Sequence, residues 1–338
     1  MKREDFRITP ITGGMTNLLY KCSLRDEVKL LPGEKRHILL RLYGRIIKDS
    51  PETSVIDPVV FGLLAEKGLG PQLYGVFLDG RLEEYIPSRS LTTSELNNSA
   101  ISQCCARIMA SFHTLNLPIR KTPGRLFEET QGFLAATLKS MTAVPYSSDR
   151  AERVSKLLAY NLPNEVDFMW SLLANVKSPI VFCHNDLSAG NILYVENNTS
   201  DTGTQWRLQP IDFEYSFYNY RGFDIGNHFC EWCYDYNVES APYFKATLSS
   251  YPTEEEQINF IRAYLEPELP TKETIEEVRL EANAFALASH MMWGLWAAAQ
   301  SAVSTIQFDY LEYALTRLEH YTLQKAEVLN MMQETRKH

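Results

Sequence analysis

The chain lacks the features of several common protein classes. It has 33 basic residues against 42 acidic ones and a net charge of −9, without the positive excess typical of nucleic-acid binders. Its six cysteines in 338 residues are too few for a disulfide framework. One C-x-x-C pair, Cys230 and Cys233, has no second Cys or His pair to complete a zinc site. We expect reduced cysteines, a cytoplasmic location and no nucleic-acid partner.

Segments that would direct the chain to a membrane are also missing. The first five residues are mostly charged, so no signal peptide is visible. From Asn283 to Phe308 the single ionisable side chain is His290, but polar residues interrupt this run and acidic residues flank it. No Lys/Arg asymmetry would orient a span there. We interpret the run as a buried helix and expect no transmembrane segment.

The composition nevertheless suits a large folded protein. Hydrophobic residues make up 45% and charged residues 22% of the chain, enough to bury a full core. The Walker A motif GxxxxGK[ST] does not occur, which excludes a P-loop NTPase. A length of 338 residues fits one large domain or two lobes.

The pattern of apolar residues divides the chain into two parts. Residues 1–87 are β-rich with one helix, and residues 88–338 are mostly helical. The elements predicted in the first part are strands at 8–11, 18–24, 38–43, 74–77 and 81–86 and a helix at 58–67. In the second part we predict helices at 93–114, 126–142, 152–161 and 165–176 and strands at 180–182, 192–194 and 206–211. This order predicts an α+β, two-lobed protein-kinase-like fold with its ATP site in the interlobe cleft.

Three polar side chains carry the strongest chemical signal. Asp186 is followed five residues later by Asn191, and Asp212 ends an apolar strand further on. This is the order in which kinases place a catalytic Asp and the side chains that bind metal. Asp186 can accept a proton from an alcohol, while Asn191 and Asp212 offer hard oxygen ligands to Mg²⁺. The spacing predicts a magnesium-dependent phosphoryl transfer from ATP.

Two weaker features lie in the first part. Gly13, Gly14 and Asn17 could cover phosphates with backbone N–H groups, although two glycines between strands more often only form a turn. Arg41 is the one cation in an otherwise apolar strand and needs an anionic partner. An arginine there could hold phosphate oxygens in bidentate geometry.

Aromatic side chains crowd the segment after Asp212. Tyrosines and tryptophans surround Glu231, and Trp293 and Trp296 lie three residues apart on one helix face. Aromatic faces with a carboxylate can hold a quaternary ammonium through cation–π contacts. The alternative is an ordinary aromatic core.

Two longer runs resemble the choline/ethanolamine kinase family. The first contains His184-Asn185-Asp186 and Gly190-Asn191, and the second extends from Ile211 to Trp232. Within the second run, the tripeptides Arg-Gly-Phe and Cys-Glu-Trp are similar to the choline kinase branch of the family rather than to the ethanolamine-only branch. Further matches, which extend the resemblance over nearly the whole chain, lie at 40–44, 69–71, 81–83, 86–89 and 285–296.

The resemblance implies an ATP:choline phosphotransferase that makes phosphocholine, the first step towards phosphatidylcholine. Asp186 would be the base, and Asn191 and Asp212 the Mg²⁺ ligands. Arg41 would contact ATP phosphates beneath the loop with Gly13, Gly14 and Asn17, and Glu84 to Ile86 would form the adenine-side hinge. The implied choline pocket consists of Tyr215, Glu231, Tyr236, Trp293, Trp296, Phe308 and Tyr313. The family also implies a homodimer.

One position departs from the family pattern. Asp57-Pro58 stands where a glutamate on the small-lobe helix would pair with Arg41. Aspartate is shorter, and Pro58 fits the first turn of a helix, so this pairing is in question.

Three rival functions stay open at this point. An ethanolamine kinase would prefer carboxylates and hydroxyls to a full aromatic wall. An inactive kinase-like scaffold is disfavoured by the intact Asp186, Asn191 and Asp212. An aminoglycoside phosphotransferase shares the Asp…Asn…Asp order, but it would need an acidic pocket rather than an aromatic one.

Overall fold

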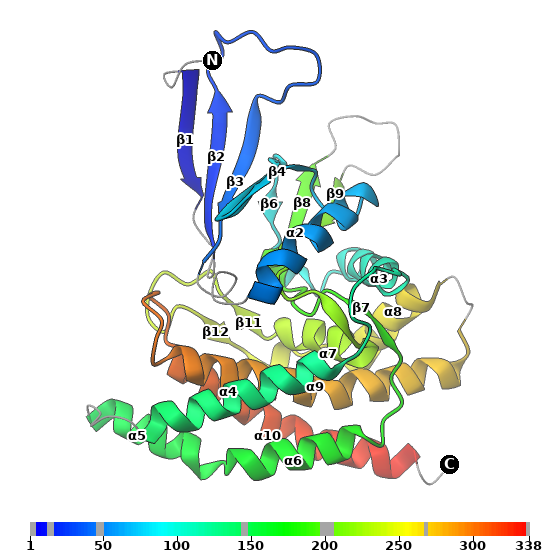
Figure 1. Ribbon diagram of the computed structural model, residues 1–338. Coiled ribbons are helices and arrows are strands. Elements are labelled where there is room, and N and C mark those ends of the chain that lie inside the picture. Colours follow the sequence, from blue (N-terminus) through cyan, green and yellow to red (C-terminus); the bar gives the residue numbers. More distant parts are fainter. Residues whose placement is uncertain are drawn as a thin grey trace. The chain divides into compact units, whose positions relative to one another are not determined.

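The computed structural model describes residues 5–11, 17–44, 51–142, 148–196, 206–266 and 270–335 (Figure 1). By the proximity of its Cα atoms the chain groups into two compact units. The first unit is Met1–Ser90 with Asn191–Tyr215, and the second is Leu91–Gly190 with Ser216–His338. Neither unit is one continuous stretch of chain. The domain division at residue 87 stays a prediction.

A five-stranded antiparallel sheet forms much of the first unit. Its strands are β1 (Phe6–Ile11), β2 (Leu18–Leu24), β3 (His37–Leu42), β4 (Leu73–Phe77) and β5 (Gly80–Glu84). The order across the sheet is β1-β2-β3-β5-β4, so both predicted hairpins are present. A Cβ at Gly80 would lie 2.0 Å from the carbonyl oxygen of Arg41, so glycine is needed for β5 to pair with β3.

A helix and a smaller sheet also belong to the described part of the first unit. The helix is α2 (Pro51–Glu66), and the three-stranded sheet has the order β6 (Arg89–Ser90), β8 (Ile192–Glu196) and β9 (Trp206–Pro210). The ring of Phe61 on α2 lies 5.8 Å from that of Phe213, just after β9. The prediction that the helix begins at Pro58 is wrong: Pro58 lies inside α2. A helix can tolerate an interior proline at the loss of one backbone hydrogen bond.

The second unit is built around one long helix (Figure 1). Its helices are α3 (Ser99–His113), α4 (Gly124–Thr142), α5 (Ser148–Ala159), α6 (Leu162–Leu173), α7 (Arg221–Glu231), α8 (Glu254–Leu265), α9 (Lys272–Gln300) and α10 (Tyr310–Thr335). Helix α9 contacts α4, α6, α7, α8 and α10, and it is buried without a break from Glu281 to Ala298. A Cβ at Gly226 would lie 2.4 Å from the carbonyl oxygen of Ala282, so this glycine lets α7 cross α9 closely.

The remaining elements are short. β7 (Ile180–Cys183) pairs with β10 (Phe217–Tyr220), and β11 (Tyr234–Asp235) pairs with β12 (Lys245–Ala246). The sequence did not predict β10, because its aromatic residues suggested a binding site. Among the described residues, 3₁₀ helices occur at η2 (Thr93–Glu95), η3 (Ala189–Asn191) and η5 (Leu248–Ser250). The single helix predicted over 93–114 is instead η2 followed by α3.

The apolar run from Asn283 is the buried part of α9, as predicted, although the helix ends at Gln300 rather than at Phe308. Within the described parts of the chain, no helix has the length and continuous apolarity that are needed to cross a bilayer.

Candidate active site

The backbone of the first unit brings the two predicted metal ligands together. β8 begins at Ile192 and pairs with the end of β9, where Ile192 stands opposite Pro210. One step further out, the amide of Ile211 donates a 3.0 Å hydrogen bond to the carbonyl of Asn191. Asn191 and Asp212 therefore leave the same end of one antiparallel strand pair.

Asp212 has a backbone and side-chain environment suited to cation binding. Its φ of 63° is uncommon outside glycine, so the surrounding structure holds this turn in a specific conformation. The carboxylate is one quarter exposed, and its Oδ1 accepts a 3.1 Å hydrogen bond from Arg41. A cation could bind the carboxylate through its other oxygen, Oδ2, and share it with the oxygens of a phosphate.

Arg41 belongs to a buried network of four charges. Its Nε donates to Oε1 of Glu83 at 2.7 Å, and Arg81 donates to the same oxygen at 2.8 Å. Arg81 also pairs with Asp57. All four side chains are at most 3% exposed. Burial alone would lower the pKa of Arg41, but Asp212 and Glu83 raise it above the usual value, so the guanidinium stays charged.

This network answers the question that the sequence raised about Asp57. Asp57 pairs with Arg81, and Glu83 takes the place beside Arg41. Glu83 lies on β5 directly across from the neighbouring strand β3, where Ile38 to Leu42 pair with Gly80 to Glu84. A short aspartate on α2 therefore does not leave Arg41 unpaired.

The remaining predicted nucleotide-binding residues are local parts of the first unit. Gly13 and Gly14 lie outside the described residues. The side chain of Asn17 donates to Glu214 at 2.9 Å and accepts from the amide of Gly44 at 3.1 Å. Glu84 ends β5, and the carbonyl of Ile86 accepts a hydrogen bond from Ser88. Their contact with a nucleotide stays a prediction.

The predicted base, Asp186, lies in a tightly turned loop after β7 in the second unit. Its amide contacts Nδ1 of His184 at 3.3 Å, and its carbonyl accepts a 2.9 Å hydrogen bond from the amide of Ser188. The preceding residue, Asn185, has a φ of 65°. A positive φ outside glycine costs free energy and persists only where other contacts enforce it.

Those contacts come from Asp224 on α7. Its carboxylate accepts hydrogen bonds from the amide of His184 at 2.9 Å and from the amide of Asn185 at 2.7 Å. Nε2 of His113 lies 3.0 Å from the same carboxylate. Burial would raise the pKa of Asp224, but His113 and the amide of His184 lower it below its usual value. Asp224 is therefore an ionised, fully buried anchor of the loop that carries Asp186.

The same anchor belongs to a cluster whose ligand atoms are close enough to suggest a metal site: His113, Cys183 and Asp224 lie within 4.8 Å of one another. Their chemistry argues against one. Burial raises the pKa of Cys183 well above its usual value, which keeps the thiol protonated, whereas metals bind the thiolate. Both oxygens of Asp224 already accept hydrogen bonds.

Asn227, one turn further along α7, links this loop to the aromatic residues. Its Nδ2 donates to the carbonyl of Asn185 at 3.2 Å. Its Oδ1 accepts from Nε1 of Trp293 at 2.9 Å and from Ser289 at 2.7 Å. The amide of one buried asparagine thus joins the base loop to a predicted wall of the cation site.

The predicted aromatic residues of the second unit form one continuous cluster. Ring centroids of Trp293 and Trp296 are 5.5 Å apart, and Trp296 is followed by Tyr310 at 5.6 Å. Tyr310 lies 4.9 Å from Phe308, which contacts Tyr313 at 5.5 Å and Tyr236 at 6.5 Å. Tyr310, which was not among the predicted pocket residues, connects the two halves. The cluster brings together the five predicted aromatic residues Tyr236, Trp293, Trp296, Phe308 and Tyr313.

Glu231 also joins this cluster, but it is not alone there. One carboxylate oxygen accepts a 3.0 Å hydrogen bond from Tyr236, and the other pairs with Arg317 on α10. Arg317 is fully buried, and its guanidinium lies 4.0 Å from the centroid of the Tyr234 ring. Burial lowers its pKa, yet Tyr313 and Glu231 raise it well above the usual value, so Arg317 stays charged.

Tyr215 is the remaining predicted pocket residue. It is buried in the first unit, at the end of the segment Asn191–Tyr215. Its role beside an acceptor stays a prediction.

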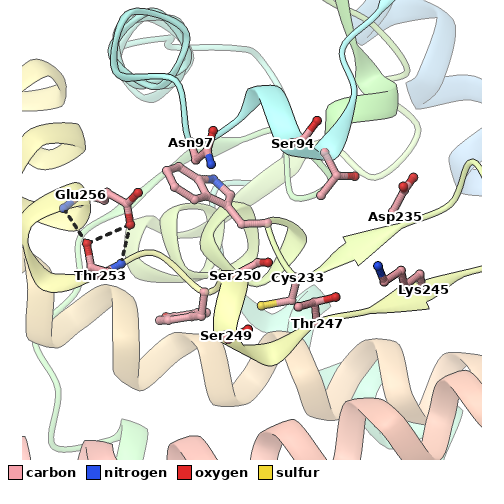
Figure 2. A pocket seen from close by; sticks show the side chains of 13 residues that line it. Ser94, Asn97, Cys233, Asp235, Lys245, Thr247, Ser249, Ser250, Thr253 and Glu256 are labelled. Carbon is pink, nitrogen blue, oxygen red and sulfur yellow. Dashed lines mark hydrogen bonds between the residues drawn. The ribbon is translucent and has the colours of Figure 1, made fainter.

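A pocket of about 400 Å³ opens elsewhere in the second unit, beside β11 and β12 (Figure 2). Its lining is rich in hydroxyl groups, and it also contains Asp235 and Lys245 from the two paired strands. Thr253 and Glu256 in this wall bind each other and cap α8, as the dashed lines in Figure 2 show. None of the predicted site residues lines the pocket, so it is separate from the aromatic cluster.

The sequence did not predict the roles of four residues that contact the predicted site residues: Glu83, Asp224, Asn227 and Arg317. Asp224 and Asn227 both lie in the conspicuous run after Asp212, and their spacing of three on one helix could have suggested a shared face. Arg317 gave no signal, because a single arginine in a C-terminal helix normally predicts a solvent-exposed charge.

A histidine beside Arg317 makes the stability of the fold depend on pH. Burial, with a contribution from Arg317, lowers the pKa of His320 to about 4. An unfolded histidine titrates near 6.5, so between these values the unfolded chain binds a proton that the folded chain does not. We expect the free energy of unfolding to fall by roughly 1–3 kcal/mol between pH 6.5 and 4 on account of His320.

Urea denaturation at pH 7.5 and at pH 5 measures this loss, and His320→Gln should make it smaller. Equal losses in the wild type and the variant would show that His320 is not the titrating group. His290, whose pKa burial also lowers, is expected to supply a residual loss in the variant.

Comparison with known proteins agrees with this arrangement. A family model described as choline/ethanolamine kinase matches residues 8–322. A protein of Rattus norvegicus named choline/ethanolamine kinase is 44% identical over 337 residues, which cover 97% of this chain and 83% of the rat protein. A protein of Mus musculus named choline kinase alpha is 42% identical, with 96% and 77% of the two chains covered.

A solved structure agrees as well. The crystal structure of a choline kinase from Cryptosporidium parvum matches this one with a TM-score of 0.78. The two sequences are 29% identical, and the match covers 98% of this chain and 92% of the Cryptosporidium chain. The predicted α+β, protein-kinase-like fold class is confirmed. The chain belongs to the choline/ethanolamine kinase family.

Proposed function

We propose that this kinase transfers the γ-phosphoryl group of ATP to the hydroxyl of choline and so forms phosphocholine. The observation that carries the proposal is the bridge through Asn227. Because Asn227 binds both the carbonyl of Asn185 and the indole of Trp293, the loop of the expected base and an aromatic wall are fixed to each other within one unit. A cationic alcohol held by that wall would present its hydroxyl to Asp186.

In this reaction Asp186 orients the hydroxyl and accepts its proton as the hydroxyl oxygen bonds to the γ-phosphorus and the bond from that phosphorus to ADP breaks. The transition state of phosphoryl transfer is loose, so the base acts chiefly by positioning. Asp224 supports it by fixing two consecutive amides of the loop. Arg41, which stays charged in the first unit, is placed beside Asp212 and is suited to neutralise phosphate oxygens.

Asn191 and Asp212 are the residues that would hold Mg²⁺. They fit a hard cation because they supply a carboxamide and a partly exposed carboxylate from the same end of the β8–β9 pair. When bound, the ion would draw negative charge from the phosphates of ATP. Its presence stays part of the proposal.

Choline suits the aromatic cluster better than most alcohols. Its quaternary ammonium donates no conventional hydrogen bond, and cation–π contact with tyrosine and tryptophan faces is the interaction that recognises such groups. Turnover of ethanolamine at a lower rate is compatible with the same site. The six free cysteines fit a reducing compartment such as the cytoplasm. We also propose a homodimer, on the resemblance to the family, and a place at the start of phosphatidylcholine synthesis.

The cation site is tested by Trp296→Ala. We expect the KM for choline to rise by about tenfold or more, since a desolvated cation–π contact contributes up to about 2 kcal/mol. The KM for ATP should change much less. Steady-state kinetics with each substrate varied in turn measures both values.

Trp296→Phe is the matched control, because it keeps an aromatic face and should lose less affinity for choline. A Trp296→Ala enzyme with an unchanged choline KM would remove Trp296 from the site. Failure of the wild type to form phosphocholine from Mg-ATP and choline would overturn the proposed function itself.

A further inference from the structure

Four side chains at the aromatic cluster form a closed hydrogen-bonded ring, here called the Arg317 ring: the buried Glu231, Tyr313 and Arg317 and the half-buried Tyr236. Arg317 pairs with Glu231 and donates from Nε to the hydroxyl of Tyr313 at 2.8 Å. The hydroxyls of Tyr313 and Tyr236 are 2.8 Å apart. Tyr236 closes the ring with its 3.0 Å hydrogen bond to Glu231.

The direction of each hydrogen bond follows from the chemistry of the groups. An ionised carboxylate can only accept hydrogen bonds, so the hydroxyl of Tyr236 donates its one proton to Glu231. The 2.8 Å contact between the two hydroxyls must then use the proton of Tyr313. Tyr313 in turn accepts from Arg317, which can only donate. Both tyrosine hydroxyl protons of the ring therefore point to another member.

The ring is also neutral as a whole. Glu231 and Arg317 contribute one charge of each sign, and both are almost completely buried. Burial raises the pKa of Tyr236 and of Tyr313, so neither hydroxyl adds a negative charge. Both tyrosines belong at the same time to the aromatic cluster, where their rings pack with Phe308.

We propose that Arg317 determines specificity by occupying the Glu231 carboxylate, so that the site selects a quaternary over a primary ammonium. This inference rests on the proposed function and names what sets its substrate class. The sequence suggested that Glu231 itself would bind the cation. In the structure the charge of Glu231 is paired with Arg317 instead. Arg317 is therefore a positioning residue that acts through Glu231 and Tyr313.

The physical reason is the number of donors on each substrate. The ammonium of ethanolamine carries three N–H donors, which lose their water on entering the site and need acceptors in return. Both oxygens of the Glu231 carboxylate already accept hydrogen bonds, one of them from the cation Arg317, so the ring offers no strong anionic acceptor. The methylated ammonium of choline needs none, and aromatic faces suffice.

Replacing Arg317 by glutamine tests this account directly. Glu231 then keeps its charge without a cationic partner, and a primary ammonium can take that place. We expect the ratio of kcat/KM for ethanolamine to kcat/KM for choline to rise by about tenfold or more, the effect of one hydrogen bond to a charged group. Arg317→Lys is the matched control: it keeps the positive charge, and the ratio should stay within about threefold of the wild type.

A carboxylate buried without its partner is strongly destabilising, which can prevent Arg317→Gln from folding. A second set of variants tests the inference in that case. Glu231→Gln leaves the charge of Arg317 unpaired and should raise the KM for choline by about tenfold or more. The double variant Glu231→Gln with Arg317→Gln removes both charges together, a change that folded proteins often tolerate. Its KM for choline should return to within about threefold of the wild type.

The outcomes separate the inference from the function on which it rests. An unchanged substrate ratio in folded Arg317→Gln overturns it, and so does a double variant whose choline KM is raised tenfold or more. The second result would mean that the carboxylate of Glu231 holds the ammonium itself. Loss of phosphocholine formation in the wild type would instead contradict the proposed function.

Discussion

Asp186→Asn lowers kcat for choline phosphorylation by about 10²- to 10⁴-fold, the range expected for loss of a general base. Asparagine has nearly the same shape and can still contact the hydroxyl, but it cannot take up its proton. The KM for ATP should change little, because the predicted nucleotide contacts of Arg41 and Asp212 lie in the first unit. The measurement is steady-state turnover combined with calorimetric titration of ATP.

The stability of this variant provides the control. The backbone of residue 186 contacts His184 and Ser188, and asparagine, with nearly the shape of aspartate, keeps these contacts. The melting temperature should therefore stay close to that of the wild type. Near-normal turnover in Asp186→Asn would reject Asp186 as the base.

Asp224→Asn lowers kcat by about 10²-fold, although Asp224 is a positioning residue. Asparagine has one acceptor oxygen in place of two, so one of the amides of His184 and Asn185 faces an NH₂ group and loses its partner. The strained turn at Asn185 is then no longer enforced. A buried hydrogen bond to a charged group contributes about 1.5–3 kcal/mol, so the free energy of unfolding should fall by a similar amount.

Glu281→Gln is the matched control for a general effect of destabilisation. Glu281 is also a buried acid, and it pairs with Arg221 at the start of the same helix, α7, and accepts from Ser178. Its replacement should cost comparable stability with a change in kcat of less than about threefold. An equal reduction of kcat in Asp224→Asn and Glu281→Gln would reject the specific role of Asp224 as an anchor of the loop. Chemical denaturation and turnover of both variants provide the comparison.

Local patterns in the sequence were sufficient to predict much of the fold. Alternating apolar residues around a turn predicted both hairpins of the first unit, which need only contacts between neighbouring strands. The run from Asn283 predicted a buried helix because it has no polar face, and α9 is buried on all sides there. The start of α2 was misplaced because proline at a helix start and proline within a helix look alike in one sequence.

Partners distant in the sequence were harder to predict. Asp186, Asn191 and Asp212 were predicted because a short, ordered spacing carries their chemistry. The pairing of Arg317 could not be predicted, since its partner Glu231 lies 86 positions earlier and the two meet only because α7 and α10 both pack against α9. The sequence predicted the aromatic residues and the carboxylate of the proposed cation site, but not that a buried arginine pairs with the carboxylate.

The central claim is that a base loop joined to an aromatic wall phosphorylates a quaternary ammonium alcohol. Its most direct test is the pair of kcat/KM values of the wild-type enzyme for choline and for ethanolamine, measured with Mg-ATP under identical conditions. The account predicts that phosphocholine forms and that choline has the larger value, by about tenfold or more. A larger value for ethanolamine, or no turnover of choline, would contradict it.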